Sequence, residues 1–459
     1  MKVCKYGGAS LRSGEDLVHI ARLVAAEPGP AVGVVSALQG VTDTILDGLV
    51  RVRAGEDAVP RLLEALRTRH TDVAKAIPSG EASAALDDLE PLFERLDRLL
   101  YGIAFTEELT PRTRDLSLAF GERLSARLLA HACRALGVDA EPLDADAAGI
   151  VTDGVFGAAT PDLAATRTNL ERTVRPRVDA GRRPILTGYF GRDADGHVTT
   201  FGRGGSDFSG AIVAAALGAE VLEVWKDVDG FLTADPRLCP QARPLPFMTY
   251  GEAAELAYLG AKVLHPRTVE PLEPQGIPVH VRSTKNPQHP GTRIGPPRAE
   301  AAHLRAIGAR DGFAIVRLHG PGMAYTPGVG RDVFAVLGDA GVNVVNMAAS
   351  QASFALLVES REAARARELV LGARIPTVEG VDIADGLTLV CFVGQGIGEK
   401  QGIAARVFDA VAQAGVNVQM ISVGASNIAL NFVIPDADKA RAVNALHHAF
   451  LRDAPEASA

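Results

Sequence analysis

Short, mainly apolar runs alternate with longer amphipathic stretches along the chain up to about residue 285. Such runs, bounded by glycine, proline or charged residues, are typical of buried strands. They occur at 1–4, 31–36, 138–143, 184–189, 220–226 and 279–283. The stretches between them predict helices. Strands that alternate with helices predict an α/β fold with a largely parallel sheet, whose ligands bind at the carboxyl ends of the strands.

Residues 50–110 interrupt this alternation. Leucines recur there at helical spacing, with charged residues in the other positions. The pattern predicts a helical insertion or lid with a solvated charged face. The segment 286–295 is rich in proline and glycine and predicts a linker at the end of the first domain.

The last part of the chain contains an internal repeat. Residues 328–334 match 402–408, and residues 340–344 (AGVNV) match 414–418 (AGVNV), with an offset of 74 residues in both pairs. Each copy predicts the order strand, glycine loop, helix, strand, strand, helix, which is a ferredoxin-like α+β module. We therefore expect three domains, at 1–295, 303–380 and 385–455.

The composition fits a globular protein of two or three domains. The chain has 459 residues, of which 47% are hydrophobic and 22% charged, and its formal net charge is −8. The acidic balance argues against a nucleic-acid partner, and no apolar run is long enough to predict a membrane span. The four cysteines are scattered without a CxxC pair, as is usual for buried thiols of a reducing compartment. We expect a cytoplasmic protein.

The stretch 199–209 (TTFGRGGSDFS) is the strongest candidate for an anion-binding site. Its glycines let backbone amides approach a ligand, and Arg203 can clamp a carboxylate or phosphate. Ser206 or Asp207 opens an apolar helix, whose start also favours anions. Alternatively, a glycine-rich turn with an ordinary helix-capping residue would explain the same residues.

Other candidates lie near predicted strand ends and helix starts. Lys5, just past the first strand, can reach a phosphate, or it is a solvated lysine in a βα turn. Glu122, in the first turn of a helix, meets a substrate ammonium or only complements the helix dipole. Thr42 serves a ligand or caps a helix, and His265 is more often structural than a base. Polar residues after strand 220–226 form a nucleotide rim or a surface turn: Lys226, Asp227, Asp235 and Arg237.

In this order and spacing, the motifs together resemble those of aspartate kinases (aspartokinases), members of the amino-acid kinase superfamily with paired C-terminal ACT domains. The similarity covers nearly the whole chain. It rests on 5–10 (KYGGAS, similar to KFGGTS), 121–125 (GERLS), 199–209, 227–237, 256–268 (LAYLGAKVLHPRT) and the repeat. It implies an amino-acid-kinase fold, with a largely parallel central sheet flanked by helices, followed by two ferredoxin-like ACT domains.

The resemblance implies an ATP-dependent kinase that phosphorylates the side-chain carboxylate of L-aspartate to 4-phospho-L-aspartate, the first step of the aspartate-family pathway that serves lysine and threonine biosynthesis. Lys5 would be catalytic, with Asp207 as its orienting partner. L-aspartate would be held by Thr42, Glu122, Arg203 and Ser206. The ATP site would be lined by Lys5, Gly7, Gly8, Ser10, Lys226, Asp227, Leu232, Arg237 and Lys262. Mg²⁺ would come with ATP rather than occupy a dedicated protein site.

For the ACT domains, the resemblance implies feedback by lysine or threonine and assembly into a homodimer or homotetramer. The effector residues would be Asn343, Gln351 and Asn417. In this family the second ACT unit often borrows a strand from before the first, and 304–310 is the candidate. A purely structural dimerisation module is the alternative.

Four positions depart from the family pattern: Tyr6, Ala9, Lys226 and Leu232. Lys226 adds a positive charge where threonine is common, and Leu232 stands where an aromatic residue often lies. None of the proposed catalytic residues is replaced, so we expect an active enzyme.

Two other functions would suit this fold. One is a kinase acting on glutamate or acetylglutamate, and the other is an amino-acid sensor with a silent kinase domain.

Overall fold

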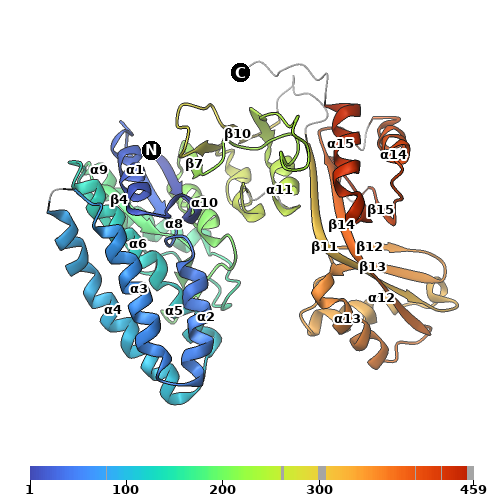
Figure 1. The fold of residues 1–459 in the computed structure, drawn as a ribbon, viewed down its shortest axis with the longest axis horizontal. Helices are drawn as coiled ribbons and strands as arrows, with labels where there is room; N and C mark the ends of the chain where they lie inside the picture. The colour runs from blue at the N-terminus through green and yellow to red at the C-terminus, as the bar shows by residue number, and fades with distance from the viewer. Residues whose placement is uncertain (79, 260–262, 298–305, 398–399, 425, 452–459) are drawn as a thin grey trace. The chain divides into compact units, whose positions relative to one another are not determined.

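The computed structural model describes residues 1–78, 80–259, 263–297, 306–397, 400–424 and 426–451 (Figure 1). Packing divides the chain into two compact units. The first contains Met1–Phe231, Pro246–Tyr250 and Val263–Pro297, and the second contains Leu232–Leu245, Gly251–Lys262 and Arg298–Ala459. The domain boundaries at 1–295, 303–380 and 385–455 remain predictions.

The first unit is built on an eight-stranded sheet with the order β3-β4-β2-β1-β7-β9-β10-β8. Its strands are β1 (Lys2–Tyr6), β2 (Ala31–Val35), β3 (Ala140–Leu143), β4 (Arg183–Thr187), β7 (Val221–Lys226), β8 (Phe247–Thr249), β9 (Val279–Ser283) and β10 (Thr292–Gly295). Neighbouring strands are parallel except for β9 and β10. The largely parallel sheet expected from the sequence is confirmed.

Helices pack on this sheet and on one another, as Figure 1 shows for the long helices α2, α3, α4 and α6. The helices are α1 (Gly14–Ala25), α2 (Val41–Ala54), α3 (Ala58–Ala74), α4 (Glu81–Thr106), α5 (Pro111–Leu118), α6 (Phe120–Arg134), α7 (Ala145–Ala148), α8 (Leu163–Thr173), α9 (Arg175–Asp179) and α10 (Gly205–Leu217). The predicted insertion at 50–110 is helical, and its leucines lie in the core or pack against it. Local sequence explains several helix starts: Ser13 accepts a hydrogen bond from the backbone of Asp16 at the start of α1, and Thr110 does the same for Thr113 in α5.

Two local predictions in this unit are wrong. Lys5 lies inside β1 rather than past its end, because the backbone stays paired on both sides, with Val34 of β2 and Val224 of β7. The expected linker at 286–295 contains a strand, β10. Its residues Thr292 and Ile294 are buried and pair with β9, so the alternating pattern outweighs the proline and glycine around it.

The second unit contains a six-stranded antiparallel sheet with the order β12-β13-β11-β14-β16-β15. Its strands are β11 (Ala306–His319), β12 (Asn346–Ala349), β13 (Ser353–Glu359), β14 (Gly380–Val393), β15 (Met420–Ser422) and β16 (Ala429–Pro435). The helices are α11 (Tyr250–Tyr258, whose first residue belongs to the first unit), α12 (Val329–Asp339), α13 (Ser360–Gly372), α14 (Ile403–Gln413) and α15 (Lys439–Phe450). This order confirms the duplicated module.

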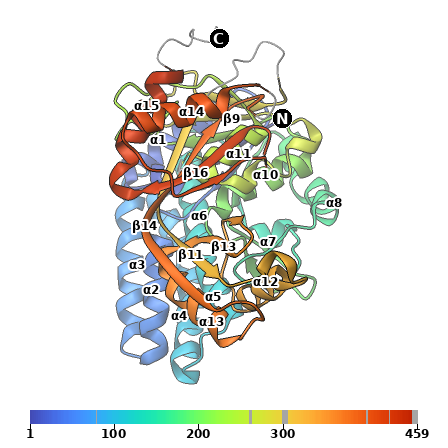
Figure 2. The ribbon, with the colours of Figure 1, turned by 90° about the vertical axis from the view of Figure 1, so that its right-hand side faces the viewer.

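The two long strands β11 and β14 run side by side and join the two repeats (Figure 2). The first part of β11, from Ala306 to Arg310, pairs with Val393 to Leu389 of the second repeat. The described part of the predicted borrowed strand therefore does belong to the second repeat. Among the described residues, no helix is long and apolar enough to cross a membrane.

Candidate active site

A group of three charged side chains, two of them buried and the third half-buried, lies at the centre of the first unit. The Asp207 carboxylate, in the first turn of α10, contacts Lys5 Nζ through Oδ1 and lies 2.7 Å from Lys226 Nζ through Oδ2. Lys5 and Asp207 are almost fully buried. The sequence predicted Lys5 and Asp207 as partners, and the structure brings them together. It adds Lys226, expected only at the nucleotide rim, to the same pair.

Burial and mutual attraction set the protonation of this group. Burial lowers the pKa of Lys5 to about 8, and the neighbouring charge of Lys226 also lowers it, whereas Asp207 opposes both. Burial disfavours the charged form of Asp207, but Lys226 and Lys5 outweigh it and hold the pKa of that carboxyl well below its ordinary value. At neutral pH the group therefore carries two cations and one anion, a net positive charge suited to phosphate oxygens.

The fold explains why these side chains meet. The parallel neighbours β1 and β7 carry Lys5 and Lys226 toward the same end of the sheet. Helix α10 packs closely on β1 because it has glycine at position 210, where a Cβ atom would lie 3.1 Å from the Cβ of Lys5. This approach places Asp207 over the strand that carries Lys5.

The turn after β1 keeps its backbone close to the lysines. The backbone NH of Gly7 donates to Trp225 O at 3.2 Å, and a Cβ on Gly8 would lie 2.9 Å from Ala37 O, so a larger residue would crowd the turn. Ser10 is buried and its hydroxyl accepts from that of Thr284 at 3.1 Å. The predicted phosphate turn thus lies beside Lys5 and Lys226.

Glu122 is a buried carboxylate in the first turn of α6. Burial raises its pKa to about 8, against the opposing effects of hydrogen bonds from the Ala37 backbone and the Ser206 hydroxyl and of the Lys5 charge. Its Oε2 has no hydrogen-bond partner among the described residues. A buried carboxylate with an unused oxygen suits a cationic group of a ligand.

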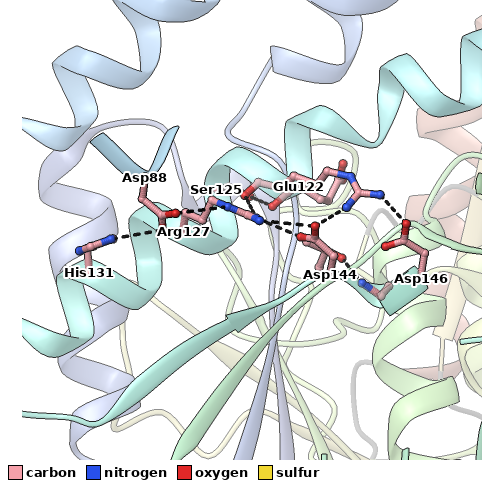
Figure 3. A network of polar contacts seen from close by, with 10 residues as sticks. Asp88, Glu122, Ser125, Arg127, His131, Asp144 and Asp146 are labelled. Atoms are coloured by element: carbon pink, nitrogen blue, oxygen red, sulfur yellow. Dashed lines mark hydrogen bonds and ion pairs between the residues drawn. The ribbon is translucent and has the colours of Figure 1, made fainter. Parts of the chain in front are cut away.

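An ion-pair network fixes the helix that carries Glu122 (Figure 3). The next residue, Arg123, is buried and pairs with Asp144 and, at 2.7 Å, with Asp146. Arg127 lies 3.0 Å from Asp144 as well. These contacts tie the start of α6 to the segment after β3. Sequence reasoning quoted Arg123 in its motif but gave it no role, because its partners lie in a segment without a motif.

The remaining predicted substrate residues surround the start of α10 and the first turn of α2. Ser206 is buried beside Glu122. Arg203 is exposed in a turn between Gly202 and Gly204, which have φ angles of 76° and 72°. Thr42 is half-buried. In the part of the chain that the structure describes, neither Arg203 nor Thr42 has a side-chain ion pair or hydrogen bond.

His265 lies against the glycine turn. A Cβ on Gly204 would lie 2.2 Å from His265 Cδ2, so the ring fits only because position 204 lacks a side chain. Burial lowers the pKa of His265, and Asp207 opposes this shift. Packing against the turn is a structural role, in keeping with the interpretation that the sequence favoured.

The predicted nucleotide residues are distributed over both units. Asp227 follows Lys226 and lies 3.5 Å from Lys285 Nζ. Leu232 and Arg237 belong to the second unit, where Arg237 pairs with Asp235 at 2.6 Å. Lys262 lies outside the described residues. The roles of these residues in nucleotide binding remain predictions.

The predicted effector residues occupy matching places in the two repeats. Asn343 follows α12 and Asn417 follows α14, and both are exposed. Gln351, also exposed, donates from Nε2 to the Tyr325 hydroxyl at 3.1 Å. The AGVNV segments lie before β12 and β15 rather than inside them.

Potential metal ligands gather in two groups among the described residues, Cys4–Glu27–Glu223 and Asp193–Asp195–His197. Lys2 Nζ lies 2.9 Å from Glu27 and 3.4 Å from Glu223, so a protein cation already pairs with both carboxylates of the first group. In the second, His197 Nδ1 lies 3.1 Å from Asp193. Neither group includes the charged residues around Lys5, and Asp207 is already engaged by two lysines.

Comparisons with known proteins agree with this architecture. Residues 1–283 match the amino acid kinase family, and residues 316–371 and 390–450 match an ACT domain family. The chain is 33% identical over 465 residues to Aspartokinase 1, chloroplastic, of Arabidopsis thaliana, covering 98% of this chain and 80% of that protein. It is 31% identical to the bifunctional aspartokinase/homoserine dehydrogenase of Haemophilus influenzae, of which it covers 57%.

Solved structures are similar over the same length. E. coli aspartokinase III in complex with aspartate and ADP has a TM-score of 0.85 at 28% identity, and the match covers 98% of this chain and 100% of that one. The same enzyme in complex with lysine and aspartate has a TM-score of 0.82 at 29% identity, with the same coverage.

Proposed function

Because this chain belongs to the aspartokinase family of amino acid kinases, we propose that it transfers the γ-phosphoryl group of ATP to the side-chain carboxylate of L-aspartate, with 4-phospho-L-aspartate as product. The observation that carries this proposal is the buried Lys5–Asp207–Lys226 group beside Glu122. It combines positive charge for a phosphoryl group with a carboxylate for an amino-acid ammonium.

Lys5 supplies the charge that stabilises the transferring phosphoryl group. Phosphoryl transfer depends on positioning and charge neutralisation more than on covalent help from the protein. Asp207 holds Lys5 in place and keeps it protonated in spite of burial. The aspartate nucleophile is already ionised at neutral pH, so its attack on the phosphorus needs no general base.

Glu122 and Arg203 bind the two ends of the substrate's α-amino-acid group. Glu122 accepts from the ammonium, Arg203 pairs with the α-carboxylate, and Thr42 and Ser206 add hydrogen bonds. Two observations support these roles: among the described residues, neither Glu122 Oε2 nor the Arg203 guanidinium has a partner. The side-chain carboxylate of aspartate then points toward Lys5.

ATP is the phosphoryl donor, and its phosphates lie along the turn after β1. The backbone amide of Gly8 and the Ser10 hydroxyl approach the phosphates together with Lys5 and Lys226. The Gly7 amide, which donates to Trp225 O, helps to shape the turn itself. The remaining nucleotide contacts are assigned to Asp227, Leu232, Arg237 and Lys262. The described site residues do not form a cage for Mg²⁺, so we assign the ion to the ATP phosphates and derive no step through it.

A coupled assay of ADP release with a panel of acceptors tests the proposal. Aspartate should give turnover at least tenfold above glutamate and N-acetylglutamate, and Lys5→Ala should abolish it. Equal turnover with glutamate would reject aspartate as the acceptor. A wild-type protein without turnover on any acceptor would favour an amino-acid sensor.

The ACT repeats are proposed to bind a feedback amino acid, lysine or threonine, through Asn343, Gln351 and Asn417, and to hold the chain in a homodimer or homotetramer. The solved lysine complex of E. coli aspartokinase III supports an amino-acid effector in this family. Titrations with lysine and threonine, alone and together, test this regulation. No inhibition by either would leave the repeats as assembly modules.

The product would enter aspartate-family amino-acid synthesis as its first intermediate. We place the enzyme in the cytoplasm, because all four cysteines are free and buried, as expected in a reducing compartment.

A further inference from the structure

Asp115 is a fully buried carboxylate of α5 that lies outside every motif used above. Its Oδ2 accepts two backbone hydrogen bonds, from Gly157 N at 2.7 Å and from Thr200 N at 2.8 Å. Its Oδ1 has no hydrogen-bond partner among the described residues. Burial raises the pKa of Asp115, and the two backbone donors oppose that rise.

Both backbone donors, Gly157 N and Thr200 N, lie in segments that support the turn carrying Arg203. Thr200 is the last residue of β6 (Val198–Thr200), three positions before Arg203. The loop at Gly157 packs on the next part of the turn, since a Cβ on Gly202 would lie 2.8 Å from Gly157 O. The same loop returns to the strand end, because Ala159 N donates to Thr200 O at 3.0 Å.

The position of Arg203 depends on this backbone support. Within the described part of the chain its guanidinium has no ion-pair or hydrogen-bond partner. The glycines on both sides of it have no side chains of their own, so backbone contacts and the His265 ring against Gly204 hold the turn. A carboxylate that bonds two backbone NH groups at once is a strong and directional restraint. Fixing a ligand-binding side chain before the ligand arrives lowers the entropy cost of binding.

We propose that Asp115 is a positioning residue for aspartate recognition: by bonding Gly157 and Thr200, it fixes the turn from which Arg203 reaches the substrate's α-carboxylate. The proposal rests on the role assigned to Arg203 above. It predicts that loss of the Asp115 charge weakens the binding of aspartate and changes little else in the reaction.

A double-mutant cycle with Arg203 tests the proposal in the full-length protein. Asp115→Asn should raise KM for aspartate about tenfold and change kcat and KM for ATP less than twofold. In an Arg203→Ala background the same substitution should change KM for aspartate less than twofold, because its effect passes through Arg203. The matched control is Ser117→Ala on the same helix, which removes a buried hydroxyl that donates to Thr113 O at 2.8 Å.

Equal effects of Asp115→Asn with and without Arg203 would overturn the proposal, as would a fall in kcat with KM unchanged.

Hydrogen exchange of the wild-type protein gives a second test that does not need a folded variant. The Gly157 and Thr200 amides should be protected without aspartate, and rapid exchange of both would contradict a preformed turn.

A wild-type enzyme that fails to phosphorylate aspartate would reject the proposed function. One that phosphorylates aspartate while Asp115→Asn leaves its KM unchanged would reject only the role of Asp115.

Discussion

Lys226 Nζ lies 2.7 Å from Asp207 Oδ2, so the carboxylate that orients Lys5 also neutralises a second lysine. The burial of Lys5 and the charge of Lys226 together lower the pKa of Lys5 to about 8. The family resemblance alone would have placed a threonine at position 226. The second lysine therefore brings the pKa of the first closer to neutral pH.

The first prediction concerns the alkaline limb of activity. The role proposed for Lys5 requires its protonated form, so kcat/KM for ATP should fall as pH rises through about 8. Lys226→Met removes a charge that disfavours protonated Lys5, so the limb should move to higher pH by roughly one unit. Lys75→Met, at an exposed ion pair with Asp72, serves as control. A limb that does not move in Lys226→Met would show that Lys226 does not influence Lys5.

The second prediction concerns stability without the central carboxylate. Asp207→Asn leaves the buried Lys5 ammonium beside the half-buried Lys226 ammonium without a carboxylate between them. It should lower the free energy of unfolding at pH 7 by roughly 3 kcal/mol. Without its carboxylate partner, Lys5 has a still lower pKa in the folded protein than in the unfolded chain, so the stability of this variant should recover as pH rises toward 9. Urea denaturation at the two pH values measures this recovery.

The matched substitution for this test is Asp72→Asn, which breaks the exposed pair with Lys75 and should cost less than about 0.5 kcal/mol. An equal loss in Asp207→Asn at pH 7 and pH 9 would mean that lysine repulsion is not its cause.

The third prediction concerns Glu122, whose folded pKa of about 8 lies above its ordinary value of 4.5. Between these values the unfolded chain loses the proton and the folded protein keeps it, so this group lowers stability as pH rises. Glu122→Gln has no titrating carboxyl at this position, so its stability should not fall in this way as pH rises. Its free energy of unfolding should nearly match that of the wild type at pH 4.5 and exceed it by roughly 4 kcal/mol at pH 8.5. Glu56→Gln, at an exposed position, should follow the wild type, and a Glu122→Gln curve parallel to the wild type would contradict a buried, proton-retaining Glu122.

The fourth prediction is proton release when aspartate binds. In the proposed complex the substrate ammonium favours the ionised form of Glu122, so the pKa of Glu122 should fall from about 8 and a fraction of a proton should leave at pH 7. Calorimetry in two buffers of different ionisation enthalpy measures the release. It should decrease toward pH 9, where Glu122 is already ionised, and should be smaller in Glu122→Gln. Proton uptake at pH 7 would contradict the contact between Glu122 and the ammonium.

Much of the fold followed from local pattern. Alternation of apolar runs and helical stretches was enough for the parallel sheet, and the repeated AGVNV segments were enough for the duplicated module. The sequence could not show that Thr292–Gly295 is a strand, because its pairing depends on β9 and β8. It also could not show that 232–245 packs with the second unit, where Ala234 and Cys239 join a core that includes Phe392.

Part of the candidate site could also be predicted from the sequence, and part could not. Motif residues such as Lys5, Glu122 and Asp207 could be identified because their types suggest chemistry. Asp115 could not, since its two partners lie 42 and 85 residues away and are backbone amides with no sequence signature. Only the folded chain brings these groups together.

Trapping of the product tests the central claim most directly. An acyl phosphate reacts with hydroxylamine, so wild-type enzyme with ATP, Mg²⁺, aspartate and hydroxylamine should form aspartate hydroxamate, dependent on both substrates. Lys5→Ala should lower its rate at least a thousandfold. ADP release without hydroxamate, or hydroxamate formation that survives Lys5→Ala, would contradict phosphoryl transfer to aspartate at this site.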